Sequence, residues 1–221
     1  MPWRETDGLA RRTSVREVPM RLRRSTILVI LLSSTLILNA ASLREVKGGT
    51  LISTADPSAS FTPDKSFRYA GGQSIDILKV AGAEQHFFIV AAADHSIRRF
   101  YWIQFEHYYP SNASAYDYSG IAQKPVALGR LAFMGDVRVS PHYFTMDDRP
   151  DSDSKAAADF LRAKGFKLDG TFVTLRLFHL PDASRRREVM IIYGEILPGG
   201  ASEERATSEI TAHARANIKV S

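Results

Sequence analysis

The chain has 221 residues, of which 44% are hydrophobic and 24% charged, and it contains no cysteine. This composition is that of a globular protein, and the absence of thiols excludes disulfide bonds, thiolate metal sites and a cysteine nucleophile. The formal charge of +5 is unevenly spread: residues 1–24 carry seven arginines and three acidic residues, whereas residues 43–221 are nearly neutral. A nucleic-acid-binding domain usually presents a basic stripe on its folded surface, so we expect no nucleic-acid partner.

Residues 25–42 contain no charged side chain and directly follow the basic residues 1–24. A basic leader, an apolar stretch and small residues at its end are typical of a secretory signal peptide. With eighteen residues, the segment also meets the lower limit for a single membrane anchor, and a buried core helix is a third interpretation. We expect a basic cytoplasmic leader over 1–24 and a signal or anchor helix over 25–42.

This leader predicts where the rest of the chain resides. Arginines next to an apolar segment stay on the cytoplasmic side, so the domain after residue 42 is expected outside the cytoplasm. It would be free in the periplasm if the leader is cleaved. If the leader is not cleaved, residues 25–42 would anchor the domain in the inner membrane.

Residues 43–66 are rich in glycine, proline, serine and threonine, which predicts a tether with one short strand near 50–54. A single α+β domain over 67–221 is expected to follow. Apolar and β-branched runs bounded by turn residues predict strands at 74–80, 85–93, 97–109, 126–133, 137–144, 171–180 and 188–197. Glycines predict turns at 71–72 and at 134–136.

Two helices are expected, at 154–164 and at 203–217, and Gly165 is placed to end the first one. Short connections between neighbouring strands predict a mainly antiparallel sheet of about seven or eight strands. The last two strands should form a hairpin with a buried core, which consists of Val173, Leu175, Leu177, Val189, Ile191 and Tyr193.

Motifs that would name a reaction are missing from the sequence. The six histidines lack the spacing of a helical zinc site, and the acidic residues 147–153 do not match a calcium loop. Neither a dinucleotide fingerprint, a phosphate loop nor a nucleophile elbow is present. We therefore expect no metal and no cofactor. The run of arginines at 185–187 fits a solvated turn, and the alternative is contact with an anionic membrane surface.

The strand at 97–109 has an unusual face. Alternation along a strand places Trp102, Gln104 and Glu106 on one side, which mixes an aromatic ring with an amide and a carboxyl group. This pattern fits either an interior hydrogen-bond network or a surface that binds a ligand or partner. Because loops that follow strands often carry binding residues, the candidate site also includes three residues of the next loop, Tyr116, Asp117 and Tyr118.

The leading hypothesis is a non-enzymatic envelope protein that binds another envelope protein or a small ligand on this aromatic and polar face. The alternative is a cofactor-free hydrolase or isomerase that uses Glu106 with His107 or Asp117 as acid and base. Glu106 and His107 are neighbours in the sequence and face opposite sides of a regular strand, which weighs against this pairing.

Overall fold

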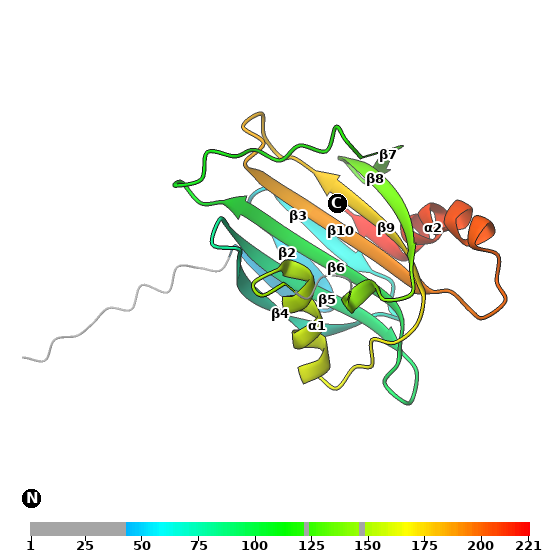
Figure 1. Ribbon diagram of the computed structural model, residues 1–221. Coiled ribbons are helices and arrows are strands. Elements are labelled where there is room, and N and C mark those ends of the chain that lie inside the picture. The colour runs from blue at the N-terminus through cyan, green and yellow to red at the C-terminus, as the bar shows by residue number, and fades with distance from the viewer. Residues whose placement is uncertain (1–42, 122–123, 146–148) are drawn as a thin grey trace, which may run out of the picture. The chain divides into compact units, whose positions relative to one another are not determined.

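The computed structural model describes residues 43–121, 124–145 and 149–221. These residues form two α-helices and eleven strands, and the strands make two antiparallel sheets (Figure 1). The expected α+β class and antiparallel pairing are confirmed. The expected seven or eight strands account for the larger sheet only. The signal or anchor helix expected at 25–42 lies outside the described residues.

The larger sheet has seven strands in the order β4-β5-β6-β10-β9-β8-β7. Its centre is buried on both faces, because most consecutive residues of β5, β6 and β10 are buried, whichever face their side chains are on. The strands are β4 (Arg68–Ile77), β5 (Ala81–Ala91), β6 (Ile97–Tyr108), β7 (Lys124–Leu128), β8 (Leu131–Ser140), β9 (Phe172–His179) and β10 (Arg187–Ile196).

The smaller sheet has four strands in the order β1-β2-β3-β11. Its strands are β1 (Arg44–Lys47), β2 (Thr50–Ser53), β3 (Ala59–Pro63) and β11 (Ile218–Val220). The expectation of a tether over 43–66 is therefore wrong, because three strands occupy it and Leu51 and Phe61 are fully buried. These strands are four or five residues long and alternate polar with apolar side chains, so their composition resembles that of a linker.

Each face of the larger sheet packs against a different layer. On one face, the smaller sheet and α2 (Glu203–Asn217) share a core with Tyr101, Ile103 and Leu175. On the other face, α1 (Asp153–Ala163) and the short 3-10 helix η1 (Tyr143–Thr145) cover Phe100 and Trp102. Figure 1 shows α1 in front of the sheet and β2 and β3 behind it.

The hairpin of β9 and β10 pairs as expected, with Tyr193 opposite Leu175 and Ile191 opposite Leu177. All six of its expected core residues are buried. The turns expected at 71–72 and 134–136 are wrong, because both glycine positions lie inside strands β4 and β8. Gly135 leaves room for a neighbour, since a Cβ there would lie 2.9 Å from Leu177 Cδ2. The described part of the chain contains no helix long and apolar enough to cross a membrane.

Candidate functional site

The face of β6 singled out in the sequence begins in the interior. Trp102 and Gln104 are almost completely buried, and Trp102 Nε1 donates to Gln104 Oε1 at 3.1 Å. The same Gln104 oxygen accepts from Gln85 Nε2 at 2.9 Å. Gln85 in turn donates to the carbonyl of Asp153 in the first turn of α1, at 3.1 Å. These two site candidates therefore belong to an interior hydrogen-bond network that joins the sheet to α1.

Glu106 lies at the outer end of the same network, where the sheet is covered by a loop. Gln104 Nε2 donates to one carboxyl oxygen of Glu106 at 2.8 Å, and the hydroxyl of Tyr116 donates to the other at 2.7 Å. Tyr116 belongs to residues 109–121, which follow β6 and are called the 109–121 segment below. The structure thus brings Glu106 and Tyr116 together, as the sequence analysis proposed for a site.

A second carboxyl group lies beside Glu106. Glu188 on β10 is directly opposite Glu106 across the antiparallel pair, so both side chains are on the same face. Glu188 is only 4% exposed, and its carboxyl accepts a hydrogen bond from the Tyr118 hydroxyl. We call Glu106 and Glu188 the carboxyl pair. Glu188 is not among the residues predicted from the sequence, because its position beside Glu106 depends on the pairing of two strands far apart in the chain.

The surroundings of the carboxyl pair favour its protonated form. Burial raises the pKa of Glu106, and the nearby Asp153 carboxylate adds to this, while the hydrogen bonds from Tyr116 and Gln104 act in the opposite direction. Burial raises the pKa of Glu188 well above its ordinary value, and the charge of Glu106 contributes. Two carboxyl groups that interact in this way titrate as one unit and retain a proton to a higher pH than isolated ones.

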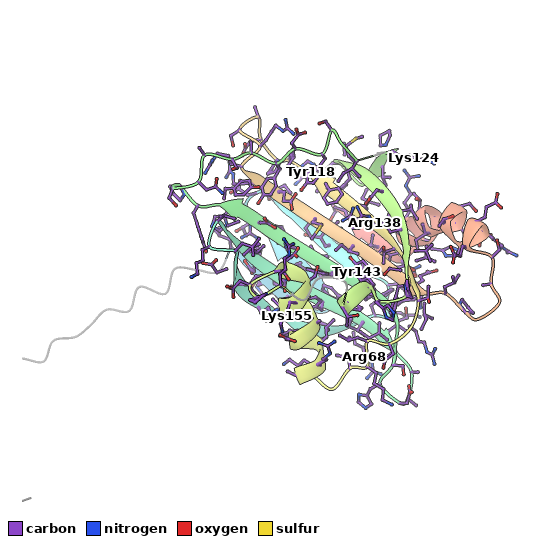
Figure 2. All side chains as sticks on the ribbon, viewed as in Figure 1. Arg68, Tyr118, Lys124, Arg138, Tyr143 and Lys155 are labelled. Carbon is purple, nitrogen blue, oxygen red and sulfur yellow. The ribbon has the colours of Figure 1, made fainter. Side chains whose placement is uncertain are left out.

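Stacked aromatic rings cover the carboxyl pair. The Tyr116 ring stacks on Tyr108 at 4.5 Å, and the Tyr118 ring stacks on Phe178 at 4.3 Å. The backbone N–H of Tyr116 donates to the carbonyl of Arg185 at 2.8 Å. Figure 2 shows Tyr118 over the ends of β9 and β10. The 109–121 segment is therefore held to the sheet by stacking and by two hydroxyls bonded to carboxyl groups.

The remaining candidates lie apart from this cluster. Asp117 is exposed and pairs with Arg185 at 3.3 Å. His107 is exposed, and it lies on the opposite face of β6 from Glu106, since it is the next residue along the strand. Among the described residues, no hydrogen bond joins Glu106 to His107 or to Asp117. The geometry pairs Glu106 with Glu188 instead.

A cavity of about 830 Å³ opens at the ends of the two sheets. Phe105 and His107 contribute to its lining from β6, together with Arg44 from β1 and Arg187 from β10. Glu106 and Glu188 also line it, although their carboxyl groups accept from tyrosine hydroxyls on the face of β6 opposite to Phe105 and His107. Residues of both faces of β6 therefore border the cavity, and the carboxyl pair is among them.

The three arginines that line the cavity have different partners. Arg44 lies over the Phe105 ring at 4.2 Å and pairs with Glu84 at 3.4 Å. Arg187 pairs with Asp56, which also lines the cavity, and with Asp182. A further arginine, Arg186, donates to the carbonyls of Tyr109 and Ser114, at 2.9 and 3.0 Å.

One position on the cavity floor requires glycine. A Cβ at Gly82 would lie 2.9 Å from His107 Cε1 and 3.2 Å from Tyr109 Cε1. The missing side chain lets both rings lie across β5. His107 and Tyr109 pack edge to face at 6.0 Å, which gives the floor an aromatic surface.

Across residues 43–121, 124–145 and 149–221, no group of three or more metal-ligating side chains could hold a metal ion. No family model, curated protein or solved structure matches the chain. Function is therefore argued from the cavity and the carboxyl pair alone.

Proposed function

We propose that the chain is an exported, non-enzymatic envelope domain that binds a small ligand in the cavity between the ends of its two sheets. The observation that supports this most is the cavity itself, at about 830 Å³. Pockets for small molecules typically measure 300–1,000 Å³ and combine apolar walls with a few polar groups. Phe105 and Tyr109 provide such walls, and His107 and three arginines provide the polar groups.

The charges favour a ligand with an anionic group. Three arginines line the cavity, together with Asp56, Glu84 and the carboxyl pair, and the surroundings of the pair favour its protonated form. Arg186 donates to backbone carbonyls, which leaves its positive charge uncompensated by these acids. A ligand with an anionic group near Arg186 and His107 and an apolar part against Phe105 and Tyr109 would match both the polar and the apolar residues that line the cavity.

Export is proposed from the leader, in which a basic stretch precedes the uncharged residues 25–42. The neutral, cysteine-free domain requires no particular redox environment. We propose a periplasmic or membrane-anchored location, where the partner could also be another envelope protein that delivers or receives the ligand.

A cofactor-free hydrolase or isomerase is the second candidate. The carboxyl pair favours it, because two coupled carboxyl groups provide an acid and a base. Binding is better supported, because both carboxyl groups, although they line the cavity, already accept hydrogen bonds from Tyr116 and Tyr118.

Titration with the fluorescent amphiphile anilinonaphthalene sulfonate tests the ligand class. The full chain, expressed with its leader, should be recovered outside the cytoplasm and should bind the probe saturably. His107→Glu places a negative charge in the cavity and should weaken binding by about tenfold or more. His142→Glu is the matched control, since His142 is exposed and does not line this cavity.

Equal probe affinities in the two variants would contradict the cavity as the binding site. Native mass spectrometry of the same preparation should show a bound acidic small molecule that His107→Glu loses. A full-length product confined to the cytoplasm would contradict export.

A further inference from the structure

We infer that Glu106 and Glu188 form a single proton-binding site, and that the shared proton holds the 109–121 segment and with it one wall of the cavity. The part that concerns the cavity rests on the proposed function. The part that concerns the proton rests on the geometry of the carboxyl pair alone.

The first step is the position of the two carboxyl groups. Directly opposite residues of an antiparallel pair have Cβ atoms about 4.5–5.5 Å apart, and like charges at such positions are destabilising. Glu106 and Glu188 occupy such a position, and Glu188 is 4% exposed. Water is therefore largely excluded from the second carboxyl group, so screening by solvent is weak. The pair is stable when it carries a proton and is strained when both groups are ionised.

The second step is the attachment of the 109–121 segment. Tyr116 donates to Glu106 and Tyr118 donates to Glu188, so each carboxyl group binds one hydroxyl of the same segment. A single ionisation leaves both hydrogen bonds in place, because a hydroxyl donates to either form of a carboxyl group. A second ionisation adds repulsion between two negative charges, and separating them pulls the two tyrosines out of their positions.

The third step connects this segment to the cavity. Tyr109 and Pro110, at the start of the segment, line the cavity together with Arg186. Arg186 donates to the carbonyls of Tyr109 and Ser114, and its own carbonyl accepts from the N–H of Tyr108 at 3.0 Å. Loosening of the segment therefore displaces the residues that form this wall.

The groups that surround the pair set the direction of the pH effect. Asp153 of α1 raises the pKa of Glu106, and Arg186 acts on the neighbouring Tyr108. Three tyrosines lie beside the pair: Tyr118, which donates to Glu188, and Tyr108 and Tyr116, whose own pKa values are raised, so that these two stay protonated as pH increases. Because the folded pKa values of both glutamates lie above the ordinary 4.5, the stability from the pair is fully present below 4.5. It is lost as pH rises through the folded values.

Hydrogen exchange at the Tyr116 amide and the affinity for anilinonaphthalene sulfonate should be measured on the full chain from about pH 4 to about pH 9. In the wild type, the protection factor of this amide should fall by about tenfold or more, which corresponds to one pKa unit. Probe affinity should fall over the same range. Glu188→Gln keeps the shape and removes one ionisation, so both quantities should stay within about threefold.

Glu195→Gln is the matched control. Glu195 is also on β10 and also accepts from a tyrosine, Tyr193, but it lies opposite Arg99 instead of a carboxyl group. This variant should respond to pH like the wild type. Glu106→Gln removes the other ionisation and provides a second test if Glu188→Gln does not fold.

The possible results separate the two proposals. An equal loss of protection in the wild type and in both carboxyl-pair variants would overturn the proton-binding site. A pH-dependent loss of protection with unchanged probe affinity would overturn the link to the cavity. If protection depends on pH as expected but no variant binds the probe, the proposed function fails and the proton-binding site stands.

Discussion

Glutamates on β10 occur in two contrasting settings. Glu195 lies opposite Arg99, whereas Glu188 lies opposite Glu106, although each accepts a hydrogen bond from a tyrosine hydroxyl. The two glutamates therefore both have a tyrosine donor but differ in the residue across the strand. Burying one carboxyl group opposite another lowers stability, and a glutamine at either position would fit the fold without this loss. This contrast is why we assign a role to the carboxyl pair.

At Gly194 on β10, a single neighbouring side chain leaves no room for a larger residue. Gly194 lies opposite Phe100 of β6, and a Cβ at this glycine would overlap the Phe100 ring. Phe100 is fully buried and packs against Tyr143, Phe144 and Phe172, so it has little room to move. Gly194→Ala should lower the free energy of unfolding by about 1–3 kcal/mol through overpacking, measured by denaturant unfolding.

Gly199→Ala is the control for this prediction, because a Cβ at Gly199 would have no atom within 4 Å. It should change stability by less than about 0.5 kcal/mol. Equal stabilities of the two variants would mean that the Phe100 ring is not fixed against β10.

At the scale of elements, α1 is attached to the sheet by side-chain amides. Gln85 donates to Asp153 O and Gln73 donates to Ala156 O, while Ser152 caps the helix by accepting from the Lys155 N–H. Gln73 also donates to Gln85 Oε1 at 2.8 Å, so the glutamines form a continuous ladder across β4, β5 and β6. The polar residues of this face therefore replace part of the apolar contact between α1 and the sheet.

Gln85→Met should test this attachment. Methionine has a similar volume but neither the donor nor the acceptor, so Gln104, Gln73 and the Asp153 carbonyl would each lose one hydrogen bond, and of these Gln104 is fully buried. We expect a loss of about 1–3 kcal/mol in the free energy of unfolding, since unsatisfied buried polar groups have this effect. Amide exchange in the first turn of α1 should also become faster.

Asp159→Ala, on the exposed side of α1, serves as its control and should change stability by less than about 0.5 kcal/mol. If Gln85→Met is as stable as the wild type, the ladder is not what attaches α1.

Elements with strong local signals could be predicted from the sequence, and weak ones could not. The second helix was expected at 203–217, where α2 lies, and the first at 154–164, one residue beyond α1. Apolar runs likewise located β9 and β10. The strands β1 and β3 were missed, because each is only four or five residues long and lies in a region rich in serine, proline and glycine.

At the scale of the whole molecule, the limit of prediction is long-range pairing. Alternation correctly placed Trp102, Gln104 and Glu106 on one face, and the burial of the first two near α1 depends on how a helix fifty residues later packs. Glu188 was recognised as the start of a strand, but only the pairing of β10 with β6 brings it opposite Glu106. The cavity also combines β1 and β10, which no local pattern connects.

The smaller sheet shows the same dependence, because β11 near the end of the chain completes a sheet that begins at Arg44. Ile218 and Val220 of β11 are buried in the core between the sheets, and the backbone of Ser221 exchanges two hydrogen bonds with Ser60. Removing residues 218–221 should lower the free energy of unfolding by about 3–6 kcal/mol, since each buried aliphatic side chain contributes about 1.5–3 kcal/mol. Thermal and denaturant unfolding of the truncated chain would measure this loss. Lys219→Ala changes the exposed residue between the two buried ones and should alter stability by less than about 0.5 kcal/mol. A truncated chain as stable as this control would show that the smaller sheet does not depend on its last strand.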